Sequence, residues 1–167
     1  MEAITFMFIF TSIIIILTPG QDMILVMSRS ITQGKKAGVI TAAGTATGLL
    51  CHTLLATLGL GALLMASELL FNIIKILGAF YLFYLGYQLL KSSDHKLLIN
   101  NLPKVSNKKM FLQGAISNIS NPKIAIFYFS YLPQFVVPSS GNETFQLFVL
   151  GLVFAVLTFL MKAPIGY

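Results

Sequence analysis

Two apolar stretches of this chain are each interrupted by polar residues around a proline. The first cluster is Thr18-Pro19-Gly20-Gln21-Asp22, and the second consists of Asn118 and Asn121-Pro122-Lys123. A proline removes a helix N–H and clashes with the preceding turn, so both helices are predicted to break there. Polar and charged groups at membrane depth are costly and normally face protein or a cavity. Two broken helices in corresponding halves therefore predict a substrate and ion pathway lined by these residues.

The chemistry of the breaks suits a zwitterion. A broken helix exposes carbonyl oxygens before the break and N–H groups after it, and these ends carry opposite partial charges. An ammonium group would be held by the carbonyls or Asp22, and a carboxylate by the free amides, Asn118, Asn121 or Lys123. The same Asp22 is expected to carry a coupling proton, because a low-dielectric environment favours the neutral form of a carboxyl group.

Each of these residues also has a purely structural interpretation. Asp22 would then cap the helix that follows the first break. Lys123 would form an ion pair with Asp22 that closes the bundle. Asn118 and Asn121 would satisfy the backbone groups that Pro122 leaves free.

A histidine and two glycines share one predicted span. His52 lies near its centre, where it is either a proton relay or a hydrogen-bond donor between helices. Gly44 and Gly48 are spaced to admit a neighbouring backbone, from this chain or from the second subunit of a homodimer. An intramembrane hydrolase using His52 with Ser117 or Ser130 is a weaker alternative. Because no Gly-x-Ser-x-Gly or HExxH motif is present, no enzyme, metal or cofactor is expected.

The composition predicts an all-α integral membrane protein. With 56% hydrophobic residues, 10% charged residues and a mean hydropathy of +0.86, the chain has too little polar surface for a water-soluble globule. A bilayer crossing takes about 20 residues. The sequence therefore predicts one transmembrane domain, 1–167, with five helices, of which the first and fourth are broken; the spans are about 3–27, 39–65, 69–90, 111–136 and 144–161.

Basic residues indicate the orientation. They gather in two predicted loops, about 28–38 and 91–110, and such clusters are typical of cytoplasmic loops. They also suit anionic lipid head groups, so the partner they predict is the bilayer and not nucleic acid. Glu2, Glu68 and Glu143 fall on the other side, which places the amino terminus outside.

An inverted three-plus-three repeat is a further prediction. Shifting Pro19 onto Pro122 places the second span on the fifth to within a few residues. The third span then has no counterpart. A sixth helix is therefore expected beyond Tyr167, and the sequence is interpreted as truncated.

Two ordered sets of residues carry a resemblance to a known family. The first half contributes Thr18-Pro19-Gly20-Gln21-Asp22, Arg29, Gly34, Gly38, Gly44, Gly48 and His52. The second half contributes Gly114, Asn118, Asn121-Pro122-Lys123, Phe127, Leu132-Pro133-Gln134-Phe135 and Lys162-Ala163-Pro164-Ile165-Gly166-Tyr167. Together they resemble the signatures of the LysE/RhtB family of amino-acid exporters. Gln21 departs from the pattern, since family members usually have a second proline there.

The resemblance implies a function. It implies a secondary transporter of about six helices in the bacterial inner membrane, which exports amino acids or closely related small metabolites. Coupling to the proton gradient is expected. The alternative is an inactive or regulatory membrane fragment that binds longer homologues.

Overall fold

The chain is entirely helical over the part that the computed structural model describes, which is residues 2–18, 20–91, 102–137 and 140–165. This agrees with the all-α class that the composition predicts. In chain order, the described residues form seven α-helices and a short 3-10 helix: α1 (Glu2–Leu17), α2 (Gln21–Gln33), α3 (Lys35–Ala66), α4 (Glu68–Lys91), α5 (Asn107–Ile119), α6 (Pro122–Tyr131), η1 (Leu132–Phe135) and α7 (Glu143–Ile165).

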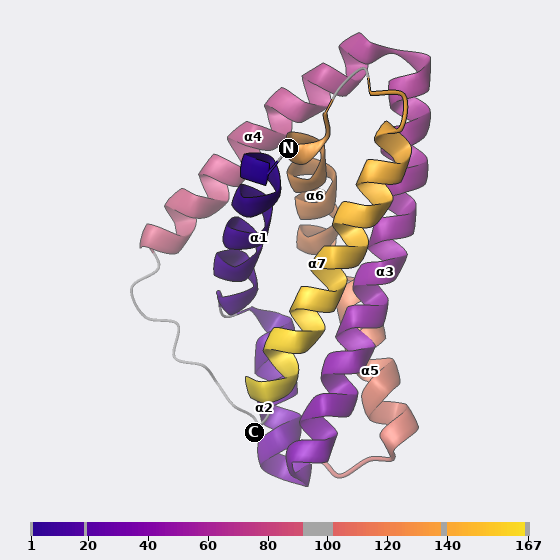
Figure 1. The fold of residues 1–167 in the computed structure, drawn as a ribbon. Helices are drawn as coiled ribbons and strands as arrows, with labels where there is room; N and C mark the ends of the chain where they lie inside the picture. The colour runs from indigo at the N-terminus through magenta and orange to yellow at the C-terminus, as the bar shows by residue number, and fades with distance from the viewer. Residues whose placement is uncertain (1, 19, 92–101, 138–139, 166–167) are drawn as a thin grey trace.

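α3 is the central helix and runs along the length of the bundle (Figure 1). α5, α7 and α2 pack along it, whereas α4 packs mainly on α6 and crosses the bundle at an angle (Figure 1). A buried aromatic cluster, which includes Phe8, Phe127, Tyr131 and Phe154, joins α1, α6 and α7. The Tyr131 hydroxyl lies 2.9 Å from Ser12 Oγ, so this polar atom keeps a partner in the apolar core.

Three helices in the described residues are long and apolar enough to cross a membrane: Lys35–Ala66, Glu68–Gln88 and Glu143–Pro164. α1 and α2 provide a fourth candidate if the bent pair is counted as one span. The predicted fourth span, about 111–136, is divided among α5, α6 and η1, whose single lengths are too short to cross a bilayer.

The first predicted break is present between α1 and α2. α1 ends at Leu17, α2 begins at Gln21, and their axes differ by 56°. The carbonyl of Ile15 would normally accept from residue 19, but a proline has no N–H to donate. The Thr18 N–H lies 3.2 Å from that carbonyl and donates instead. Pro19 itself lies outside the described residues.

The second predicted break separates α5 from α6. Asn121 ends the gap as the N-cap of α6: its side-chain oxygen accepts from the Lys123 backbone N–H over 3.0 Å. Pro122 occupies the first helical turn, where its missing N–H would have had no helical partner. Asn121 thus satisfies a backbone N–H at this break, in line with the structural interpretation weighed for it from the sequence.

The first basic connection is shorter than the predicted loop 28–38. α2 continues to Gln33 and α3 begins at Lys35, so only Gly34 separates them. Gly34 has φ of 89°, a conformation that glycine adopts without a steric penalty. The connection between α2 and α3 lies within the basic segment 28–38, but most of that segment is helical. Basic charge therefore does not distinguish a loop from the ends of helices. In the second predicted loop, 91–110, residues 92–101 lie outside the described part.

Arg29 and Gln33 fasten the end of the second connection to α2. Arg29 is buried, although the sequence assigns it to a loop, and it donates to the Pro103 carbonyl over 2.7 Å. Gln33 donates to the Val105 carbonyl over 2.8 Å and accepts from the Val105 N–H over 2.9 Å. These contacts fix the segment that leads into α5, whose N-cap is Ser106.

Candidate functional site

The two helix breaks meet in the folded chain. Asn118, at the end of α5, donates from Nδ2 to Oδ2 of Asp22 in the first turn of α2 over 2.6 Å. Asn121 donates from Nδ2 to Oε1 of Gln21 over 3.3 Å. Two polar clusters that lie about a hundred residues apart in sequence therefore contact each other. The sequence predicted that both line one pathway, but not which side chains meet.

Asp22 is the centre of this site. Its side chain is 6% exposed, and Oδ2 lies 3.5 Å from Nζ of Lys162 on α7. Its other oxygen, Oδ1, has no hydrogen-bond partner among the described residues. A buried carboxylate needs a counter-charge and hydrogen bonds. Asp22 has Lys162 as its counter-charge and one hydrogen bond from Asn118, and its Oδ1 stays without a donor in the described residues.

Lys162 is a site residue that the sequence reasoning missed. From the sequence, Lys162 is part of the family resemblance and has no predicted role in the site. The signal that would have found it is its isolation: a lysine within an apolar helix needs a counter-charge. The ion pair weighed between Asp22 and Lys123 is not formed, because Lys123 is exposed at the start of α6 and Asp22 pairs with Lys162.

His52 contacts the backbone carbonyl of Asn118. In an uninterrupted helix the carbonyl of Asn118 would accept from the N–H of residue 122, which here is Pro122. His52 Nε2 lies 3.1 Å from that carbonyl. A carbonyl only accepts, so the ring nitrogen is the donor. The Asn121 N–H, also at 3.1 Å, is a second donor. This is the cross-helix role weighed for His52; a relay role stays a prediction.

Gly44 and Gly48 admit a helix of the same chain. A Cβ at Gly44 would collide with the carbonyl of Phe111, and Gly48 lies against Ala115 and Asn118. Gly114 of α5 in turn lies against the backbone of α3. The predicted close packing is therefore between α3 and α5, and these glycines call for no second subunit.

Two further predicted residues, Thr18 and Gly20, lie at the first break. Thr18 donates from Oγ1 to the Ile14 carbonyl over 3.0 Å. Gly20 is the exposed N-cap of α2 and offers no side-chain cap. A Cβ added at Gly20 would meet nothing within 4 Å, so the chain around this break is open.

The hydrolase alternative gains no support from the geometry. His52 donates to the backbone carbonyl of Asn118, whereas Ser130 lies against Gly78 of α4. No group of three or more metal-ligating acids, histidines or cysteines occurs in the described ranges.

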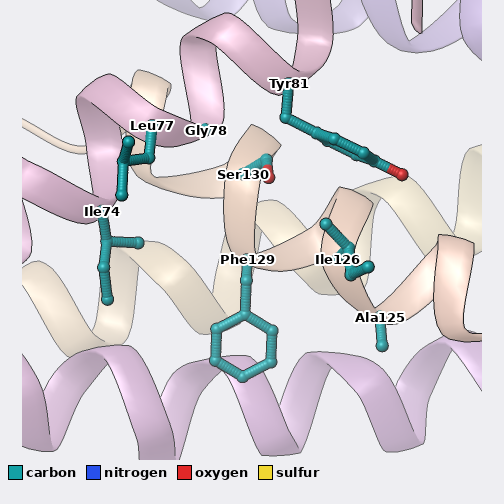
Figure 2. A pocket seen from close by; sticks show the side chains of 8 residues that line it. All are labelled: Ile74, Leu77, Gly78, Tyr81, Ala125, Ile126, Phe129 and Ser130. Atoms are coloured by element: carbon teal, nitrogen blue, oxygen red, sulfur yellow. The ribbon is translucent and has the colours of Figure 1, made fainter.

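An apolar groove lies apart from the site. It has a volume of about 420 Å³ and lies between α4 and α6, with Tyr81, Phe129 and Ser130 among its lining side chains (Figure 2). None of the residues around Asp22 lines it.

Comparison with known proteins assigns the chain to a family. The sequence profile of the LysE type translocator matches residues 13–164. An uncharacterised membrane protein of Bacillus subtilis (strain 168), YrhP, is 38% identical, with 87% of this chain and 73% of the relative covered. The homoserine/homoserine lactone efflux proteins of Salmonella typhimurium and Salmonella typhi are 34% and 33% identical, each with 87% of this chain and 70% of the relative covered. No solved structure matches. The family consists of membrane translocators rather than enzymes, and this chain belongs to the LysE-type translocator family.

Proposed function

We propose that the chain is a secondary transporter that exports amino acids, or closely related small metabolites, across the bacterial inner membrane in exchange for protons. The observation that carries this proposal is the buried Asp22, which Asn118 holds between the two helix breaks. Ionisable residues within apolar helices are costly, and they commonly mark substrate and ion pathways. Membership of a translocator family agrees with this function.

The proposed site lies where transporters of broken-helix type bind their substrates. α1 ends at Leu17 and α2 begins at Gln21, so the carbonyl end of α1 precedes the Asp22 carboxylate by only a few residues in the chain. The carbonyl end of α1 and the Asp22 carboxylate both favour a cation. The proposed sequence is that Asp22 binds the substrate ammonium group and releases it when a proton takes its place.

The proposed topology has five membrane spans in this chain. The α1–α2 pair, α3, α4, the α5–α6 pair and α7 would each cross the bilayer once. The basic residues around Gly34 and before α5 would lie in the cytoplasm. This arrangement puts the amino terminus outside and gives the two broken pairs opposite directions, as an inverted repeat requires.

Homoserine is the first substrate to test. Two relatives carry the name of homoserine/homoserine lactone efflux proteins. The site around Asp22 also matches the ammonium group that all α-amino acids share, so we expect homoserine and other small amino acids to be exported.

Efflux from proteoliposomes tests the proposal. Vesicles containing the purified chain are loaded with a panel of radiolabelled amino acids, including L-homoserine, and efflux is measured with and without an imposed pH gradient. We expect wild-type efflux to rise with the gradient. Asp22→Asn should abolish that rise, because an amide carries no exchangeable charge state.

The matched control is Glu68→Gln, which removes an exposed carboxylate from the first turn of α4. It should export like the wild type. An Asp22→Asn variant that exports and keeps its full dependence on the gradient would contradict the coupling role. A wild-type chain that moves no member of the panel faster than empty vesicles would contradict the transport function itself.

A further inference from the structure

We propose that Lys162 binds the carboxylate of the substrate, so that Asp22 and Lys162 together select zwitterionic amino acids over amines that lack a carboxylate. This inference rests on the proposed function, because it concerns the same site. Nothing in the family match or in the names of the relatives assigns a role to Lys162.

The pair already has the form of a zwitterion receptor. Nζ of Lys162 lies 3.5 Å from Oδ2 of Asp22, and both side chains are largely buried. Asn118 donates to the same Asp22 oxygen and fixes it in place. Oδ1 of Asp22 has no hydrogen-bond partner in the described residues. One acceptor of the paired carboxylate is thus open to an incoming ammonium group, which has three N–H donors to offer.

Charge pairing makes this site selective. Separation of Asp22 from Lys162 would leave two buried charges without partners, which is strongly unfavourable. A zwitterion that enters between them replaces one ion pair by two, so no charge stays unpaired. A cationic amine without a carboxylate can pair with Asp22 but leaves Lys162 buried and alone. The penalty therefore falls only on ligands that lack the carboxylate.

The other candidate carboxylate receptors are already engaged or exposed. Lys123 is exposed, Asn121 caps α6 and binds Gln21, and the amide of Asn118 binds Asp22. Arg29 is buried, but its guanidinium donates to the loop before α5. Within the described ranges, Lys162 is thus the buried cation that faces Asp22.

The chain is exposed directly before this pair. Gly20 and Gln21, which directly precede Asp22, are exposed. A Cβ added at Gly20 would meet nothing within 4 Å. We therefore expect a substrate to reach the buried carboxylate from the α1–α2 junction.

Equilibrium binding to the full chain in nanodiscs tests the inference, with radiolabelled L-homoserine and L-homoserine lactone as probes. The two share an ammonium group, and only homoserine has a free carboxylate. We expect the wild type to prefer homoserine by about tenfold or more, since unpaired buried groups strongly reject a ligand. Lys162→Gln should weaken homoserine binding by a similar factor and remove the preference. Lys162→Arg should retain it, and Lys108→Gln, which removes an exposed lysine from the first turn of α5, should behave as the wild type.

Each outcome decides the question. Unchanged homoserine binding in Lys162→Gln, or an equal loss for both probes, would overturn the inference, as would a wild type with no preference. If Lys162→Gln does not fold, the double variant Asp22→Asn/Lys162→Gln is used, because it leaves no unpaired buried charge. A preference for homoserine that the double variant retains would also overturn the inference. Vesicle efflux is a separate readout. Selective binding without any efflux would contradict the proposed function and leave the role of Lys162 standing.

Discussion

Gly48 of α3 lies directly against the side chain of Asn118 on α5. A Cβ at Gly48 would lie 2.7 Å from Cβ of Asn118 and 2.8 Å from its Oδ1. Contacts this short force one of the two groups to move. Asn118 reaches Asp22 only because position 48 has no side chain, so the packing of α3 on α5 and the position of the buried carboxylate depend on each other.

Gly48→Ala should therefore impair both stability and export. We expect a loss of about 1–3 kcal/mol in the free energy of unfolding, the usual cost of overpacking a tight interface. Export should fall as well, because Asn118 must shift away from Asp22. Unfolding in mixed detergent micelles and vesicle efflux measure the two effects.

The control for this substitution is Gly86→Ala. An added Cβ at Gly86 of α4 would meet nothing within 4 Å. Alanine also favours helix over glycine by about 1 kcal/mol. Gly86→Ala should be neutral or stabilising and should leave export unchanged. Equal destabilisation by both alanines would contradict the close contact with Asn118.

His52 offers a test between anchoring and proton relay. His52→Leu removes a donor from the Asn118 carbonyl, which still accepts from the Asn121 N–H. The expected loss is therefore small, about 1 kcal/mol. His52→Gln keeps a side-chain donor and should restore stability and proton-coupled efflux. A stable His52→Gln variant without gradient-dependent efflux would favour the relay.

The sequence predicted the helical class and both breaks because each follows from a local rule. Pro122 and the Thr18-Pro19-Gly20 segment cannot continue a helix, whatever surrounds them. The partner of Asp22 could not be predicted in the same way. Lys123 and Lys162 are equally basic in sequence, and only the packing of α7 against α2 brings one of them to the carboxylate.

The boundaries of the first connection show another limit of sequence reasoning. Arg29, Lys35 and Lys36 were interpreted as a loop from charge alone, yet all three lie in helices on either side of Gly34. A helix can extend beyond the apolar region and keep its backbone hydrogen bonds. Charge alone therefore does not mark where a helix ends.

Cysteine labelling tests whether the α5–α6 pair crosses the bilayer. Lys104 precedes α5 and Ser140 follows η1, and both are exposed. With Cys51 replaced by alanine, cysteines at Lys104 and Ser140 should be labelled by an impermeant maleimide from opposite sides, with Lys104 on the cytoplasmic side. Labelling of both from one side would show that α5 and α6 enter and leave on the same face.

Gln33 should hold the segment before α5 in place. Its side chain makes two hydrogen bonds with the backbone of Val105, so Gln33→Ala leaves that N–H without its partner. We expect amide hydrogen exchange in residues 102–106 to speed up severalfold, because net protection by one hydrogen bond corresponds to about 1 kcal/mol. Gln88→Ala is the matched control, since Gln88 donates to the Tyr84 hydroxyl on the exposed face of α4. If exchange before α5 is equally fast in both variants, or unchanged in Gln33→Ala, then the contacts of Arg29 and Thr32 hold this segment to α2 without Gln33.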